Sequence, residues 1–175
     1  MKKSLILILL LIVLQSFDSR TKWKVYQNDY YIIEYPRNWN KLETPSSMVF
    51  LPGEIKVGYV KESFSVYIDT LIGYDNLSDY YSFLLEQTKK SSNNIIKSEI
   101  INTEKEVYYL LSYEGVELEW MDDSKYIEKV KVANKKAYRM VFFSEKKKFN
   151  KYLPIIDHMM ESFKIKDTIK KTGNH

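Results

Sequence analysis

The amino-acid sequence predicts an α+β fold in which an antiparallel sheet of about six to seven strands lies between helices, as an α/β/α sandwich. Two observations support this prediction. About seven short β-rich segments are separated by polar turns, and two helical segments far apart in the chain each carry one apolar stripe that needs a sheet face. With 175 residues, 45% of them hydrophobic, the chain is long enough to enclose one core.

Residues 1–19 are expected to be a signal peptide, with cleavage near residues 16–19. Lys2 and Lys3 precede an unbroken apolar run over residues 5–14, which is shorter than the about 20 residues of a membrane-spanning helix. An uncleaved signal anchor is the alternative. We therefore expect an exported protein, periplasmic or secreted, that meets the membrane only through this signal.

The chain contains no cysteine. This excludes disulfides, thiolate metal ligands, cysteine nucleophiles and a lipid-modified N-terminal cysteine, so the protein is not expected to be a lipoprotein.

A single domain is expected over residues 22–166. Its first part is predicted to hold short strands at 23–26, 30–35 and 48–51. Asn28 and Asp29 are typical of the turn of a hairpin, and Pro36 ends the second strand because it has no N–H for the ladder. Residues 41–47 are polar and contain Pro45, so we expect a loop there.

The rest of the domain is predicted to alternate strands and two helices. A strand with one apolar face covers 64–68, and a helix runs from Asn76, a suitable N-cap, to about Lys90. Five strands follow, at 95–103, 107–113, 116–121, 126–132 and 137–143. The last of them is apolar on both faces, which indicates a central position in the sheet.

The final helix is expected to start close to Pro154, after a short turn or helix through Lys148 and Phe149. Proline is tolerated in the first turn of a helix but disrupts its interior. Residues 167–175 are polar and are expected to be a disordered tail.

No catalytic motif or cofactor-binding motif is present, so we expect no enzyme activity and no cofactor. Only two histidines occur, and Asp157 beside His158 cannot serve as its orienting acid because helix neighbours do not face each other. With only three arginines and a formal net charge of +4, the chain also lacks the basic field of a nucleic-acid-binding protein.

The acidic stretch 114–123 is the alternative functional candidate, for an envelope enzyme or a Ca²⁺-binding protein. The weak Ca²⁺ candidates around Trp120 are Glu117, Glu119, Asp122 and Asp123. The competing interpretation is a solvated hairpin whose carboxylates pair with lysines of the next strand.

An aromatic corner, residues 35–39, is the first candidate for a binding site. Tyr35, Arg37 and Trp39 are its candidate contact residues, and Trp120 is the second choice. In the competing interpretation Trp39 fills the end of the sheet and only Arg37 is free to bind. If Trp39 is a contact residue, Trp39→Ala should weaken binding without changing the thermal midpoint, whereas a packing role predicts loss of stability.

The segment 31–39, with its Tyr-Pro-x-x-Trp ending, resembles the opening of the PsbP-like superfamily. Further matches are the strand at 64–68, the helix at 77–85 and the ending from Ala137 through Phe163 to Ile165. The resemblance implies an antiparallel sheet between helices in a non-catalytic domain that does binding or assembly work. It implies a protein partner, which we expect to be an envelope or secreted protein.

Overall fold

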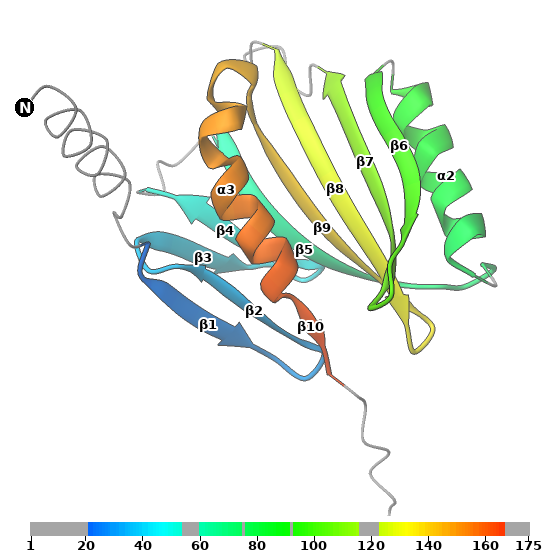
Figure 1. Cartoon of the computed structure of the whole chain (residues 1–175), viewed down its shortest axis with the longest axis horizontal. Helices are drawn as coiled ribbons and strands as arrows, with labels where there is room; N and C mark the ends of the chain where they lie inside the picture. Colours follow the sequence, from blue (N-terminus) through cyan, green and yellow to red (C-terminus); the bar gives the residue numbers. More distant parts are fainter. Residues whose placement is uncertain (1–20, 54–59, 75, 92, 116–122, 167–175) are drawn as a thin grey trace, which may run out of the picture.

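The computed structural model describes residues 21–53, 60–74, 76–91, 93–115 and 123–166, which form two antiparallel sheets and two helices (Figure 1). The large sheet has seven strands in the order β3-β4-β5-β9-β8-β7-β6, and the small sheet has three in the order β1-β2-β10. The predicted α+β class is confirmed.

The large sheet and its helices account for most of the fold. Its strands are β3 (Trp39–Glu43), β4 (Ser47–Pro52), β5 (Glu62–Thr70), β6 (Asn94–Asn102), β7 (Val107–Gly115), β8 (Ser124–Ala133) and β9 (Lys136–Glu145). The helices are α2 (Leu77–Lys90) and α3 (Lys146–Ser162), and the small sheet holds β1 (Trp23–Gln27), β2 (Tyr31–Pro36) and β10 (Lys164–Ile165).

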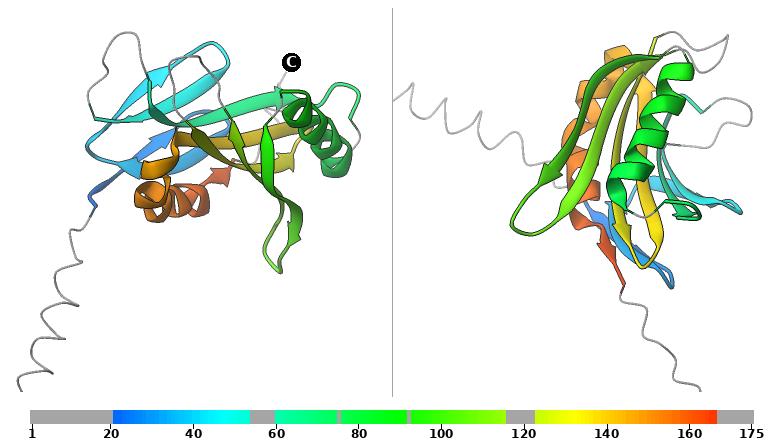
Figure 2. Two further views of the ribbon diagram at one scale, coloured as in Figure 1. Left: turned by 90° about the horizontal axis from the view of Figure 1, so that it is seen from above. Right: turned by 90° about the vertical axis from the view of Figure 1, so that its right-hand side faces the viewer.

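The two helices cover opposite faces of the large sheet (Figure 2). Phe149 and Ile156 of α3 share a buried cluster with Tyr138, whereas Leu84 of α2 shares a second cluster with Ala137. Because successive strand residues point to opposite faces, Ala137 and Tyr138 mark the two sides of β9. The small sheet packs on the α3 side, where its buried residues join the first cluster.

The predicted central position of the strand at 137–143 is confirmed. β9 lies between β5 and β8, in the middle of the seven strands. Met140 and Phe142, on the α3 side, are fully buried, while Arg139 and Val141 on the other side are half-buried.

The local signals of the turns and caps also agree with the structure. The Asn28 side-chain oxygen accepts the backbone N–H groups of Tyr30 and Tyr31, at 2.9 and 3.0 Å, in the turn between β1 and β2. Asn76 caps α2, since its side-chain oxygen accepts the Asp79 N–H at 3.0 Å.

The polar loop expected at 41–47 is wrong at both ends, because residues 41–43 belong to strand β3 and Ser47 begins β4, which leaves only residues 44–46 as the connection. In the described sheet β3 lies at the edge beside β4, and four of its five residues are exposed. An edge strand with one solvent-exposed side has the polar composition of a loop, so composition alone could not distinguish an edge strand from a loop.

The expected start of the last helix near Pro154 is also wrong, because α3 begins at Lys146 and continues through this proline. Phe149 and Ile156 lie seven residues apart on one buried stripe, which Met160 continues. Burial of this stripe outweighs the roughly 3 kcal/mol that an interior proline costs.

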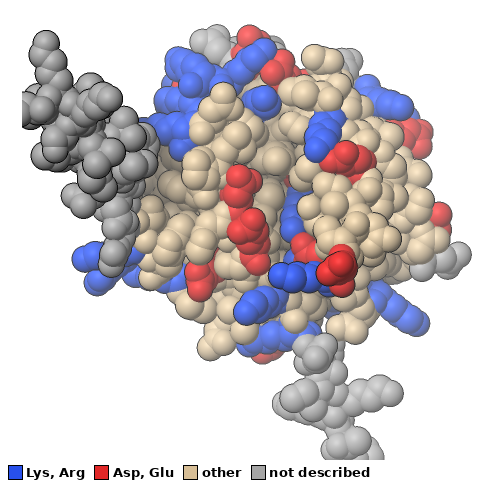
Figure 3. All heavy atoms as spheres, viewed as in Figure 1, with Lys and Arg blue, Asp and Glu red and all other residues tan. Residues whose placement is uncertain are grey.

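The expected signal peptide, the strand at 116–121 and the tail at 167–175 lie outside the described residues. Of the helices that the structure describes, none has the length and hydropathy needed to cross a membrane. Lysine and arginine side chains alternate with acidic ones over the face shown in Figure 3.

Candidate functional site

The aromatic corner lies at a groove where β2, β3, β4 and α3 meet. Pro36 ends β2, Arg37 and Asn38 turn the chain, and Trp39 starts β3 opposite Pro52. We call this the corner groove; it has a volume of about 720 Å³ and is lined by Thr21, Lys22, Arg37, Asn38, Trp39, Pro52, Gly53, Lys151, Tyr152 and Ile155.

The floor of the corner groove is aromatic and rigid. Trp39 is 5% exposed and belongs to the main core cluster. Its ring meets the Tyr152 ring edge to face, with centroids 6.0 Å apart. Since Tyr152 lies on α3 and Trp39 on β3, this contact fixes the helix against the corner.

The rim of the corner groove is cationic. Lys22, Arg37 and Lys151 are exposed, and no acidic residue is among the described residues that line the groove. The Arg37 backbone N–H donates to the Lys22 carbonyl at 2.6 Å, which holds the first two cations together. The Lys151 ammonium lies 5.8 Å from the centre of the Tyr152 ring.

None of these three cationic side chains forms an ion pair with another residue that the structure describes. Three exposed cations above an aromatic floor suit an anionic group, such as a carboxylate, that brings some apolar surface with it.

Two of the predicted contact residues reach the corner groove and one does not. Arg37 lies on its rim and Trp39 in its floor. Tyr35 is 6% exposed and packs against Phe50, with ring centroids 5.0 Å apart, inside the core. Trp120 lies outside the described residues.

Sequence reasoning missed Lys151 and Tyr152. Both lie on α3, more than a hundred positions from the corner, and no local pattern connects the two segments. Lys22 was close in sequence, but only the β1–β2 pairing places it beside Arg37.

Most of the acidic stretch 114–123 lies outside the described residues, including Glu117, Glu119 and Asp122. At its described ends, Glu114 forms an ion pair with Lys146 at 2.8 Å, and Asp123 lines a hollow together with Glu145 and two lysines. Within the described ranges no group of three or more acidic or histidine side chains is arranged to hold a metal ion.

His158 has a partner that the sequence did not suggest. Its Nε2 atom lies 2.7 Å from Glu34 Oε2 on β2, and its ring stacks on Trp23 of β1 at 3.9 Å. Asp157 takes no part in this arrangement. The pair connects α3 to the small sheet.

A second group of charges, also missed from the sequence, lies on the α2 side of the large sheet. Arg139 Nε donates to Glu128 Oε1 at 2.5 Å, and the Glu128 side chain is only 2% exposed. Arg139 also lies 3.5 Å from Asp69, which accepts the Tyr80 hydroxyl. Burial lowers the pKa of Arg139, but Glu128, Tyr80 and Asp69 together raise it more, so the net shift is upward and the guanidinium stays charged.

Comparison with known proteins identifies the family and the fold. The family model described as PsbP matches residues 21–165. The solution structure of cyanobacterial PsbP (CyanoP) from Synechocystis sp. PCC 6803 superposes with a TM-score of 0.62 at 18% identity, covering 86% of this chain and 96% of that one. None of the curated proteins compared with the chain matches it.

Two more distant structures share the fold. The Ran-binding protein Mog1p of Saccharomyces cerevisiae has a TM-score of 0.58 at 10% identity, covering 85% of this chain and 97% of that one. LpqN of Mycobacterium tuberculosis, described as involved in cell envelope biogenesis, has a TM-score of 0.51 at 8% identity, covering 86% of this chain and 88% of that one.

Proposed function

This chain belongs to the PsbP family, and we propose that it is a non-catalytic, exported domain that captures an acidic segment of a partner protein in its corner groove. The partner class is an envelope or secreted protein. Export rests on the leader pattern at residues 1–19. Two proteins with the same fold are named as a Ran-binding protein and as a protein involved in cell envelope biogenesis, which supports a binding role for this domain.

The observation that carries this proposal is the rim of three cations without ion-pair partners in the described part of the chain. Arg37 and Lys22 are held together through their backbones, and Lys151 approaches from α3. A carboxylate that meets Arg37 forms a charge-assisted hydrogen bond, which is worth about 1.5–3 kcal/mol.

The proposed segment also needs apolar contact. The Trp39 and Tyr152 rings provide a floor that does not have to be ordered on binding, because both already belong to the packed part of the molecule. An acidic segment with an aromatic or aliphatic residue therefore fits the groove better than a purely polar one.

Fluorescence anisotropy with a labelled glutamate-rich peptide tests this proposal on the full chain. Arg37→Glu and Lys151→Glu should each weaken binding by about tenfold or more, since tenfold corresponds to about 1.4 kcal/mol. Lys89→Glu is the matched control, because it makes the same charge change on α2, at the far end of the large sheet (Figure 1).

Equal affinities for Arg37→Glu and Lys89→Glu would refute the corner groove as the site, since general attraction between net charges affects both variants alike. Cross-linking in the native envelope then provides a second readout. A partner that is cross-linked by the wild type and by Lys89→Glu, but not by Arg37→Glu, supports the proposal.

A further inference from the structure

The outer side of β6 is an open edge of the large sheet. Among the strands that the structure describes, β6 pairs only with β7, so its outward N–H and C=O groups have no ladder partner there. Leu84 of α2 packs with Tyr109 of β7 and Val130 of β8, which places the helix over the sheet face behind this edge. The β6–β7 hairpin extends beyond the rest of the described domain (Figure 2). Another strand can therefore approach β6 from outside.

This edge also exposes apolar side chains. Ile96 and Ile100 of β6 are 49% and 44% exposed, and Val107 at the start of β7 is 48% exposed. β6 is nine residues long and contains no proline. Sheet edges are normally protected by short length, proline or charged side chains. In β6 only Lys97 and Glu99 are charged, and their signs are opposite.

The sequence of β6 is complementary to itself. Over residues 94–102 it is Asn-Ile-Ile-Lys-Ser-Glu-Ile-Ile-Asn, which reads the same in both directions from Ser98 except that Lys97 is matched by Glu99. Two copies of a strand that pair antiparallel about a two-fold axis place each residue opposite its mirror position. With the axis at Ser98, each lysine of β6 therefore lies opposite a glutamate of the second copy.

The two charges of β6 select this register. Lys97 and Glu99 form an ion pair within the strand, and their side chains are 52% and 40% exposed. With the axis at Ser98, each of them also faces the opposite charge on the second copy. An axis at Lys97 would bring two ammonium groups together, and an axis at Glu99 two carboxylates, and like charges directly opposite are destabilising.

A bulge in β6 leaves this complementarity in place. Ile96 is the extra residue of the bulge, between Ile95 and Lys97. Ile95 lies opposite Tyr113 of β7 and Ile100 lies opposite Tyr109, four residues away, so both isoleucines are on the same face of the sheet. In the two-fold pair, Ile95 of one copy therefore comes beside Ile100 of the other.

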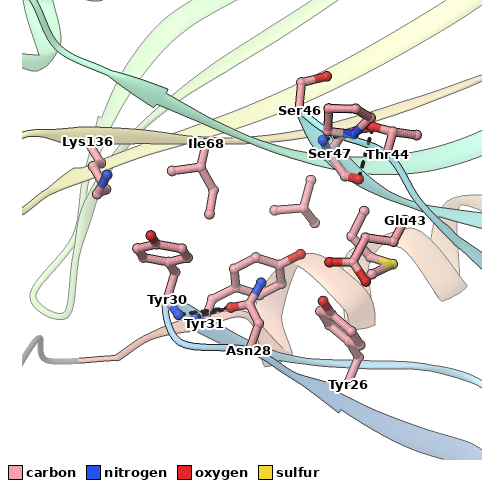
Figure 4. A pocket seen from close by; sticks show the side chains of 13 residues that line it. Tyr26, Asn28, Tyr30, Tyr31, Glu43, Thr44, Ser46, Ser47, Ile68 and Lys136 are labelled. Carbon is pink, nitrogen blue, oxygen red and sulfur yellow. Dashed lines mark hydrogen bonds between the residues drawn. The ribbon is translucent and has the colours of Figure 1, made fainter.

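The opposite edge of the large sheet, β3, directs its charged side chains to the small sheet. The Lys41 ammonium lies over the Tyr26 ring of β1, 5.2 Å from its centre. Glu43 points toward the hydroxyl ends of Tyr26 and Tyr31, across a hollow between β3 and the first hairpin (Figure 4). The charges of β3 thus serve contacts within the molecule, whereas those of β6 lie on the open edge.

We propose that β6 pairs with β6 of a second copy of this chain, antiparallel about a two-fold axis at Ser98, so that the two large sheets become one continuous sheet. The corner groove adjoins β3, at the other end of the strand order. Pairing through β6 therefore leaves both corner grooves of the dimer open, and this inference is independent of the function proposed for them.

Disulfide trapping tests the position of the axis on the full chain. The chain has no cysteine, so Ser98→Cys introduces a single thiol. Directly opposite Cα atoms in an antiparallel pair are about 4.5–5.5 Å apart, within the roughly 4.4–6.8 Å that a disulfide spans. Mild oxidation should therefore convert Ser98→Cys to a covalent dimer. Ser46→Cys, at an exposed serine between β3 and β4, is the control and should stay monomeric on a denaturing gel. Equal cross-linking of the two variants overturns the proposal.

Sedimentation velocity of charge-reversal variants tests the register. Lys97→Glu and Glu99→Lys should each weaken dimerisation by about tenfold or more, because like charges then face each other twice. A mixture of the two variants should recover the dimer, since opposite charges face each other again. Lys24→Glu, on β1 of the small sheet, is the matched control and should dimerise like the wild type.

The outcome against the proposal is equally defined. Both reversed side chains are about half exposed, so the far-UV circular dichroism of each variant should match the wild type. A wild-type chain that stays monomeric at submillimolar concentration overturns the proposal. A mixture of Lys97→Glu and Glu99→Lys that dimerises no better than either variant alone overturns it too.

Discussion

Replacement of Trp39 by alanine should destabilise the domain because its ring is packed, with 5% of the residue exposed. Truncation of a buried tryptophan costs about 3–5 kcal/mol. The lower end applies here, because Trp39 is the first residue of an edge strand and the adjoining groove lets the corner partly collapse. At about 2–4 °C for each kcal/mol in a domain of this size, a loss of about 3 kcal/mol lowers the thermal midpoint by about 6–12 °C.

Urea unfolding followed by far-UV circular dichroism measures this loss, and the urea slope should stay unchanged if only the native state is affected. Trp39→Phe keeps an aromatic ring against Tyr152 and should lose less stability. Arg37→Ala, at the exposed neighbouring position, should change the free energy of unfolding by no more than about 0.5 kcal/mol. If Trp39→Ala kept the wild-type midpoint and lost only peptide binding, the packing argument would be refuted and Trp39 would be a contact residue.

Three further predictions concern other parts of the fold. Arg139→Met should cost about 3–5 kcal/mol because it leaves the buried Glu128 carboxylate unpaired, and adding Glu128→Leu should recover much of this loss. Urea unfolding of the two single variants and the double variant measures it, and a double variant whose loss of stability equals the sum of the two single losses would contradict the prediction. Asn76→Ala should cost about 1 kcal/mol by removing the cap of α2, measured by thermal unfolding against Ser78→Ala; equal midpoints would contradict it. Burial acts to raise the pKa of Glu106, but two lysine ammonium groups lower it overall. The contribution of Glu106 to stability is therefore present above its ordinary pKa of 4.5 and is lost as acid protonates the folded protein. Glu106→Gln should reduce the fall of the unfolding free energy at acid pH, and an unchanged fall would contradict this prediction.

Local signals in the sequence predicted much of the fold. The hairpin turn at Asn28, the cap at Asn76 and the strand alternation of β5 and β9 each depend on neighbours within a few residues. The two errors, at β3 and at the start of α3, have different causes. At β3, pairing with the adjoining strand β4 makes a strand of a polar segment, and at α3, burial of the apolar stripe against the sheet outweighs the local preference against proline in a helix.

The candidate sites were harder to predict than the fold. Arg37 and Trp39 were found because they adjoin Pro36, but Lys151 reaches the same groove only through the packing of α3. One signal in the sequence pointed to the Glu128–Arg139 pair. Asn134 suits a two-residue hairpin turn, and in the structure residues 134 and 135 both have positive φ, at 54° and 58°. The register of this hairpin, with Ala133 opposite Lys136, brings Glu128 close to Arg139.

The pairing of β10 with β2 has a consequence for the order of folding. Ile165 lies opposite Tyr31, so the third strand of the small sheet comes from the last described residues of the chain. During synthesis from the N-terminus, the first hairpin has no β10 to pair with, and its Ile33 and Tyr31 lack the α3 and Phe163 surface that buries them. The small sheet must therefore be completed last, after nearly the whole domain has been made, and a nascent chain halted before residue 162 should expose this hairpin to proteases and chaperones.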